Sequence, residues 1–432
     1  MMDRSIQPKL SGLGQLSCLP PQRWAMENGM PLAVIRTGQV EMVRMDLVFG
    51  GGNFHEEMPL QAAVANRMLR EGTRRFTAAQ IEEKLDYYGA WLSLYVRDEC
   101  AVVTVFALNK FVAEVWEIMA SIVKEATFPE REYKVLMENK MQQYCVNAVN
   151  SDYLASRYFD LALLGEKHPA GRGVTVADYI GLEREQVQAY YNRYYNAANC
   201  RIYLSGMVTD SVLEATRKVF GTELWGEGTL KAGYKLVKPM PAGEKRVFVS
   251  RTDSMQNSLR MGELTIGYGH PDYMGLKMLT DLLGGYFGSR LMKNIREEKG
   301  YTYDISVQLV NRPGTGMLVI ASEADAAYTE AIVHEVKHEM EVLQQQPVDE
   351  GELTMLKNYL FGRLCRRLEG GMALADVWIA LDVHGLGDDF YERMNAVRAD
   401  ITAGQLRDLA CKYLHPQLLM EVVVGEKNAN KV

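Results

Sequence analysis

One order of segments occurs twice along the chain, and this repeat constrains the fold more than any other feature. The segments of the first half are, in order, a strand-like stretch (42–49), Gly-Gly-Gly (50–52), two helical segments (60–70 and from Thr77), a β-rich run (101–108), an amphipathic helix from about 110 and a closing strand (200–208). Those of the second half are 259–267, 273–283, 289–298, 317–322, an amphipathic helix around 332–343 and a closing strand (418–426). Strands and helices repeated over such a length indicate a duplication.

The chain is long enough for two such units, because its 432 residues exceed the usual size of one domain. We predict an α+β fold of two tandem duplicated domains, each a largely antiparallel sheet packed with helices. The domains should span residues 1–225 and 245–432 and face each other around a chamber. The polar, glycine-containing stretch 226–244 is the predicted linker.

Charge and hydropathy exclude several classes of protein. The net charge of −7 gives no basic excess for binding nucleic acid through its phosphates. No apolar run approaches the roughly 18 residues that a membrane span needs. The first residues lack the continuous apolar stretch of a signal peptide, so we expect a cytoplasmic protein. The six cysteines are too far apart for a zinc ribbon or a redox pair, and are expected to be reduced.

The string His334-Glu335-Val336-Lys337-His338 matches the pattern in which two histidines one helical turn apart hold zinc and the glutamate activates water. The helical periodicity argues against this interpretation. With the apolar positions of 332–343 facing the core, both histidines point toward solvent, and no third ligand stands out. A chance match on a solvated helix is therefore favoured, and a zinc peptidase built on His334 and His338 is the less favoured alternative.

Ser121 and Lys124 form an S-x-x-K string on what the sequence suggests is a surface helix. A serine acylase that uses this motif needs further partner groups, and the sequence offers none that we can identify. A catalytic role for Ser121 is not predicted.

The segment 289–303 is predicted to form a helix that stops at Gly300 and an aromatic strand that follows at once. Arg296 lies near the helix end and Tyr303 lies on the strand, so both side chains could converge on one point as hydrogen-bond donors. Taken alone, these residues fit a surface arginine and a half-buried strand tyrosine better than a functional pair.

This segment resembles the "SRL…LRE…G-x-x-Y" signature of the insulinase/pitrilysin-type zinc metallopeptidases, which are inverted zincins with a His-x-x-Glu-His motif. The twofold repeat, halves of about 200 residues and the run ending in Arg70-Glu71-Gly72-Thr73, similar to the family's "F-K-G-T", extend the resemblance over nearly the whole chain. It implies two peptidase-like domains. It also implies that Arg296 and Tyr303 correspond to the pair that reaches the substrate carbonyl near the zinc.

The chain departs from the family at the zinc motif. Counting back from Gly72-Thr73, the two histidine positions and the glutamate position hold Ala63, Arg67 and Asn66. No carboxylate can be placed confidently as the third ligand between 138 and 144. An arginine adds positive charge where the metal's charge would be, so we expect no metal or other cofactor in this chain.

The resemblance therefore implies the zinc-free subunit of a two-subunit zinc endopeptidase, inactive alone. Such a subunit would bind the substrate carbonyl and stabilise the oxyanion during peptide hydrolysis. Zinc would be held by a homologous partner subunit in a heterodimer, although a homodimer is possible, and the substrate would be an unfolded peptide. The alternative is a purely structural, peptidase-like scaffold subunit.

Overall fold

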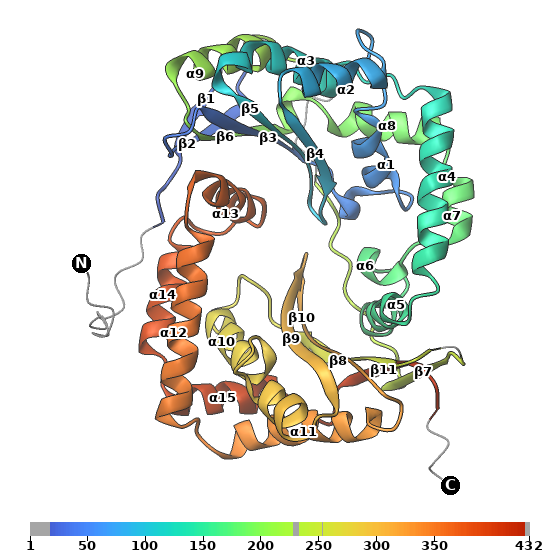
Figure 1. The fold of residues 1–432 in the computed structure, drawn as a ribbon, viewed down its shortest axis with the longest axis vertical. Coiled ribbons are helices and arrows are strands. Elements are labelled where there is room, and N and C mark those ends of the chain that lie inside the picture. Colours follow the sequence, from blue (N-terminus) through green and yellow to red (C-terminus); the bar gives the residue numbers. More distant parts are fainter. Residues whose placement is uncertain (1–17, 228–232, 253, 428–432) are drawn as a thin grey trace, which may run out of the picture.

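The structure is a computed structural model that describes residues 18–227, 233–252 and 254–427. It contains two β-sheets, one built from each half of the chain, with helices around both (Figure 1). Within the predicted linker, residues 228–232 lie outside the described residues, and the remainder of 226–244 forms neither helix nor strand. None of the described helices is both long and apolar enough to cross a membrane.

The N-terminal half runs from β1 to η4. Its strands are β1 (Gln22–Ala25), β2 (Pro31–Arg36), β3 (Met42–Gly50), β4 (Trp91–Val96), β5 (Cys100–Leu108) and β6 (Cys200–Gly206). Its helices are η1 (Asn53–His55), α1 (Gln61–Met68), α2 (Ala78–Tyr87), η2 (Asn109–Phe111), α3 (Val112–Lys124), α4 (Glu130–Asn147), α5 (Ser151–Leu164), α6 (Pro169–Arg172), α7 (Val176–Gly181), α8 (Arg184–Tyr194), η3 (Ala197–Asn199), α9 (Asp210–Thr216) and η4 (Arg217–Gly221).

The C-terminal half runs from β7 to β11. Its strands are β7 (Arg246–Ser250), β8 (Asn257–Thr265), β9 (Thr302–Arg312), β10 (Thr315–Ala324) and β11 (Met420–Gly425). Its helices are α10 (Tyr273–Gly284), η5 (Met292–Glu298), α11 (Thr329–Gln345), α12 (Glu350–Arg367), α13 (Gly371–Val383), α14 (Phe390–Asp400) and α15 (Ala403–Tyr413).

The two sheets have the same topology. The strand order is β2-β6-β3-β5-β4 in the N-terminal half, extended by β1 at one edge, and β7-β11-β8-β10-β9 in the C-terminal half. Strand β2 pairs in parallel with β6, and β7 pairs in parallel with β11, while every other strand pair is antiparallel. The α+β class and the duplication predicted from the order of segments are confirmed.

The amphipathic helices of the two halves bury the faces that their periodicity predicts. Helix α3 buries Val115, Ile118 and Ile122 in the core of the N-terminal half. Helix α11 buries Ile332, Val336 and other apolar positions in the core of the C-terminal half. Burial of a side chain of this size contributes roughly 1.5–3 kcal/mol, so these stripes hold both helices in place.

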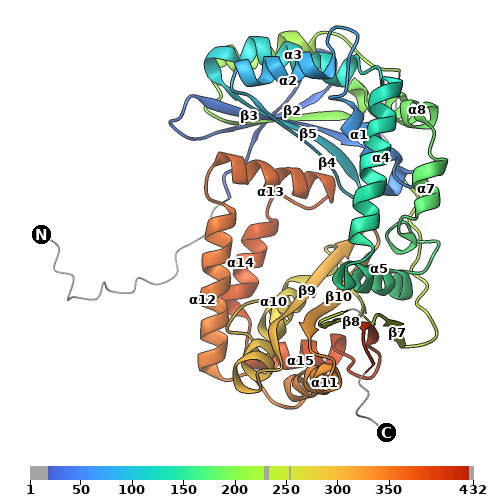
Figure 2. The ribbon, with the colours of Figure 1, turned by 45° about the vertical axis from the view of Figure 1, so that its right-hand side comes forward.

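Each sheet is also covered by a helix from the other half. Helix α5 of the N-terminal half lies against β8 and β11, where Phe159 packs with Met420 and Val422 (Figures 1 and 2). Helix α13 of the C-terminal half lies against β2 and β6 of the N-terminal sheet. There the Tyr203 hydroxyl donates to Asp382 Oδ2 at 2.5 Å. The two halves therefore exchange helices and share their hydrophobic cores.

Polar contacts join the halves near the sheet ends. Arg312 Nη1 lies 3.0 Å from Asp98 Oδ2, and His384 Nδ1 lies 2.6 Å from Glu99 Oε2. These residues line a cavity of about 920 Å³ formed by the β4–β5 turn, residues 234 and 236, the ends of β8 and β9, and the end of α13. The interface between the halves therefore combines exchanged apolar helices with a polar cavity.

Candidate functional site

Helix α1 carries Ala63, Asn66 and Arg67, the residues that the sequence resemblance aligns with a zinc motif, and is held tightly in the N-terminal core. Ala62, Val64, Ala65 and Met68 are fully buried. The helix begins after Leu60, which adopts the left-handed conformation (φ 75°). The short apolar side chains allow the helix to pack closely, so the position of each α1 residue is determined by the core.

The residues at the motif positions have interactions that do not involve a metal. Asn66 is 1% exposed, and its Nδ2 donates to the Tyr195 hydroxyl at 3.0 Å. Arg67 lies 3.6 Å from Glu71, one turn further along the chain. Ala63 has only a methyl group. Asn66 is therefore a neutral amide in the core, and Arg67 belongs to a surface ion pair.

A second cation lies in the surroundings of Arg67. Burial, and to a smaller extent the positive charge of Arg67, lowers the pKa of Lys140 on α4. Lys140 has neither a hydrogen bond nor an ion pair among the described residues. Over that same part of the chain, no cluster of three or more histidine, cysteine, aspartate or glutamate residues could hold a metal ion. An amide, a methyl group and two cations do not fit a zinc ion.

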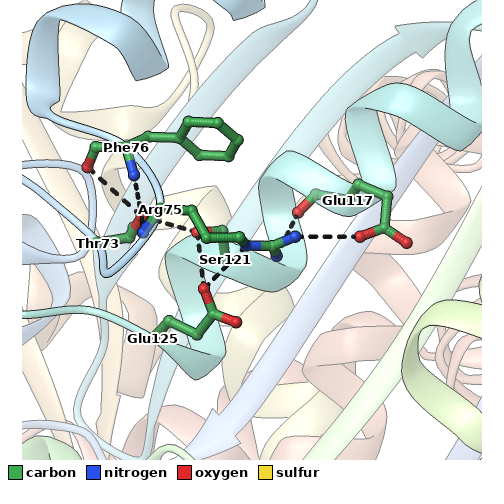
Figure 3. Close-up of polar contacts among 6 residues, drawn as sticks. All are labelled: Thr73, Arg75, Phe76, Glu117, Ser121 and Glu125. Carbon is green, nitrogen blue, oxygen red and sulfur yellow. Dashed lines mark hydrogen bonds and ion pairs between the residues drawn. The ribbon is translucent and has the colours of Figure 1, made fainter.

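The turn that follows α1 is anchored on α3 by a network of polar contacts (Figure 3). Ser121 Oγ lies 2.7 Å from Thr73 Oγ1 and 3.2 Å from Glu125 Oε2. Arg75 Nε donates to the same Glu125 oxygen at 2.9 Å. The expectation of a surface serine was wrong, because Ser121 is fully buried on the face of α3 that meets this turn. Its hydroxyl connects two elements of the fold.

The His-Glu-x-x-His string on α11 presents its histidines to solvent, as its periodicity predicts. The His334 side chain is 78% exposed, and the rings of His334 and His338 are nearly parallel with centroids 6.4 Å apart. Glu335 instead forms an ion pair with Lys299 at 2.5 Å. Its other carboxylate oxygen, Oε1, lies 3.6 Å from His334 Nδ1, so Glu335 has a partner on each oxygen. Because both histidines are exposed to solvent, the three side chains do not enclose a shielded zincin site.

Arg296 and Tyr303 lie side by side. Arg296 belongs to η5, a π-helix, which is a rare type often found at functional sites. Its guanidinium carbon lies 4.8 Å from the ring centre of Tyr303 and 4.7 Å from that of Phe287. Tyr303 is 81% exposed, on the edge strand β9. The arginine is therefore held by cation–π contacts with two exposed rings.

The donors of this pair are available to a ligand. Among the described residues, the Arg296 guanidinium forms no hydrogen bond and no ion pair. A guanidinium offers five N–H donors and a phenol offers one O–H donor. Such a cluster can bind a carbonyl oxygen, a carboxylate or a developing oxyanion.

Sequence reasoning did not identify two contributors to these sites. Phe287 lies in the Gly-Gly-Tyr-Phe-Gly loop (284–288), where an aromatic residue between glycines was a usable signal, and the structure shows that its ring is exposed. Lys140 gave no such signal, because its relation to Arg67 depends on how α1 and α4 are placed.

Comparisons with known proteins are consistent along the chain. Residues 32–166 match the family model described as Insulinase (Peptidase family M16), and residues 181–360 match the model described as Peptidase M16 inactive domain. The uncharacterized zinc protease YmxG of Bacillus subtilis (strain 168) is 24% identical over 401 residues, which are 90% of this chain and 95% of that relative. The probable mitochondrial-processing peptidase subunit beta of Arabidopsis thaliana is 21% identical over 454 residues, 98% and 81% of the two chains.

A solved structure has the same fold. The crystal structure of a peptidase M16 inactive domain from Pseudomonas fluorescens superposes with a TM-score of 0.83 at 21% identity, covering 96% of this chain and 100% of that chain. The similarity extends over both halves and not over one sheet alone.

Proposed function

Because this chain belongs to the insulinase family of peptidases (peptidase family M16), we propose that it is the zinc-free subunit of a two-subunit zinc endopeptidase. It is peptidase-like in both halves, but its N-terminal half lacks the residues that would hold the metal. The name of the Arabidopsis relative, a peptidase subunit beta, supports a multi-chain assembly. The zinc ion, and the water activation it supplies, would belong to a homologous partner subunit.

The observation that carries this proposal is the Arg296–Tyr303 pair. Among the described residues the Arg296 guanidinium has no anionic partner and contacts two exposed rings, so its N–H groups remain available to a ligand. We assign its N–H groups, with the Tyr303 hydroxyl, to the substrate carbonyl oxygen. Negative charge develops on that oxygen as water attacks, so these donors bind the transition state more strongly than the ground state.

The position of Tyr303 on an edge strand suggests how a peptide would be held. β9 is the last strand of its sheet, so one row of its backbone groups has no partner strand. An extended, unfolded peptide can pair with such an edge by β-augmentation. This arrangement would bring peptide carbonyls close to the Tyr303 side of the strand.

The test is reconstitution with a homologue from the same genome that carries His-x-x-Glu-His. We expect neither chain alone to cleave a quenched peptide, and the mixture to cleave it. Tyr303→Phe and Arg296→Ala should each reduce turnover about a hundredfold, because one oxyanion donor is typically worth about 3 kcal/mol. Assembly, measured by size-exclusion chromatography, should be unchanged.

Two results would contradict the proposal. Wild-type turnover from both variants in a fully assembled complex would leave this chain a structural scaffold. Peptide cleavage by the isolated chain, with one tightly held zinc that is lost in His334→Ala, would instead support a zinc peptidase built on α11.

A further inference from the structure

The helix that carries Arg296 is tied to α11 on both sides of the arginine. Asn294, two residues before it, donates from Nδ2 to Glu339 Oε1 at 2.7 Å and to Glu335 Oε2 at 3.1 Å. Lys299, three residues after it, places Nζ 2.5 Å from the same Glu335 oxygen. Glu335 therefore contacts the η5 segment both before and after Arg296.

The segment is also held where it begins. Arg290 donates from Nε and Nη2 to the two carboxylate oxygens of Glu352 on α12, each at 2.9 Å. Both side chains are largely buried. A bidentate arginine–carboxylate pair restricts orientation as well as distance. Carboxylates from α11 and α12 thus hold the segment that begins with Arg290.

The end tied to Glu335 leads directly to Tyr303. Gly300 turns the chain in the left-handed conformation (φ 64°), and the Tyr301 N–H donates to the Ile295 carbonyl at 3.0 Å. Strand β9 then starts at Thr302. Lys299 lies immediately before this turn, so an anchor at Lys299 influences both the end of η5 and the start of the strand.

The glutamate and the histidines of the α11 string therefore have different surroundings. The Glu335 side chain is 15% exposed and faces η5, whereas His334 and His338 are exposed. Burial alone would raise the pKa of the Glu335 carboxyl, but hydrogen bonds from Lys299 and Asn294 outweigh it and lower that pKa. The carboxylate is consequently charged at neutral pH.

We propose that Glu335 is a positioning residue that holds Arg296 and Tyr303 in register through Asn294 and Lys299. This inference rests on the proposed function, since it concerns how the same pair is oriented. In this role Glu335 acts through the two donor side chains that it anchors, Asn294 and Lys299.

The experiment compares variants on the two sides of α11 in the reconstituted complex. Glu335→Gln keeps the shape of the side chain but removes its charge, and should lower kcat on the order of tenfold, because small misplacements of catalytic groups are costly. The peptide KM and assembly should remain unchanged. Lys299→Met removes the cation that pairs with Glu335 and should lower kcat by a similar factor. The matched control is His338→Gln, on the exposed side of the same helix, with wild-type kcat.

A double-variant cycle separates positioning from general stability. If Glu335 acts through Arg296, then Glu335→Gln should cost little further turnover in an Arg296→Ala background. The same loss in both backgrounds would overturn the inference, as would wild-type kcat from both Glu335→Gln and Lys299→Met while Arg296→Ala is impaired. Wild-type turnover from Arg296→Ala and Tyr303→Phe would refute the proposed function itself.

Discussion

The two halves share a topology but differ in how two helices meet. These are α1 and α4 in the N-terminal half, and α10 and α12 in the C-terminal half. In the C-terminal half, Asp281 on α10 is almost fully buried and accepts from Lys277 at 2.7 Å and from Arg363 of α12 at 3.0 Å. In the N-terminal half, the corresponding helices α1 and α4 bring Arg67 and Lys140 into mutual repulsion. Asp281 compensates both cations of the C-terminal junction, whereas in the N-terminal half Arg67 pairs with Glu71 and Lys140 has no acidic partner among the described residues.

Helices α4 and α12 also differ in how many apolar side chains they bury. Helix α12 buries four leucines, whereas α4, of the same length, buries only Tyr133 and Met137. The N-terminal half nevertheless keeps the same strand order. The same strand order and the exchanged helices are present although the two junctions differ in charge and burial, so the fold does not depend on the chemistry of this junction.

The exchanged helices should show the largest effect on stability. Phe159→Ala on α5 and Trp378→Ala on α13 each remove a ring that is 1% exposed. Each should lower the free energy of unfolding by about 3–5 kcal/mol, because a cavity replaces a large aromatic side chain. Chemical denaturation followed by circular dichroism would measure this loss. A loss below about 1 kcal/mol for one helix would mean that its exchange contributes little.

The second largest loss of stability is expected at the junction of α10 and α12, where Asp281 pairs with two cations. Asp281→Asn removes the carboxylate and leaves Lys277 and Arg363 close together with no anion between them. Breaking a buried ion pair from one side typically costs about 3 kcal/mol, which denaturant titration at pH 7 would detect. A neutral result would indicate that water compensates these cations as well as Asp281 does.

The carboxyl groups at the starts of α1 and α10, Glu56 and Asp272, should make the free energy of unfolding depend on pH in opposite directions. Burial raises the pKa of the Glu56 carboxyl to about 7, although it accepts the Ala62 N–H at 2.9 Å. The folded state then holds an extra proton between about pH 4.5 and 7, so stability falls as pH rises through this window, by at most about 3 kcal/mol. Glu56→Gln, which keeps the acceptor oxygen, should flatten this slope.

Asp272 at the start of α10 is the comparison for Glu56. Hydrogen bonds from Lys412 and Tyr413 lower the pKa of its carboxyl, so its contribution is present above pH 3.8 and is lost as pH falls through the lowered value. Denaturation from pH 3 to 8 would test both carboxylates. A Glu56→Gln variant that keeps the wild-type slope between pH 4.5 and 7 would contradict the assignment.

The junction of α1 and α4 should show the smallest effect, with the opposite sign. Lys140→Met removes a half-buried cation without a partner and should stabilise the chain by about 1 kcal/mol at pH 7. Since the pKa of Lys140 is lowered in the folded state, the cost of its charge disappears as pH rises toward 10.5, and the variant's advantage should shrink with it. Lys134→Met, at an exposed position of the same helix, is the control.

Local patterns predicted much of the fold. The inward stripes of α3 and α11, the turn at Gly300 and the exposed histidines of α11 all follow from a 3.6-residue period or from glycine's backbone freedom. The prediction failed for Ser121, because periodicity describes one helix at a time. It could not show that the turn carrying Thr73 packs over this side of α3.

The sequence by itself determined which side chains stand at the positions that the family resemblance assigns to a zinc motif. Ala63, Asn66 and Arg67 cannot supply the imidazoles and the carboxylate of that motif, and this chemical statement needs no coordinates. The tertiary structure alone decided which distant groups meet: Phe287 and Tyr303 around Arg296, Glu335 beside Lys299, and α5 and α13 on each other's sheets. Side-chain chemistry is local to a residue, whereas these contacts join elements far apart in sequence, and only the packing of the whole chain brings them together.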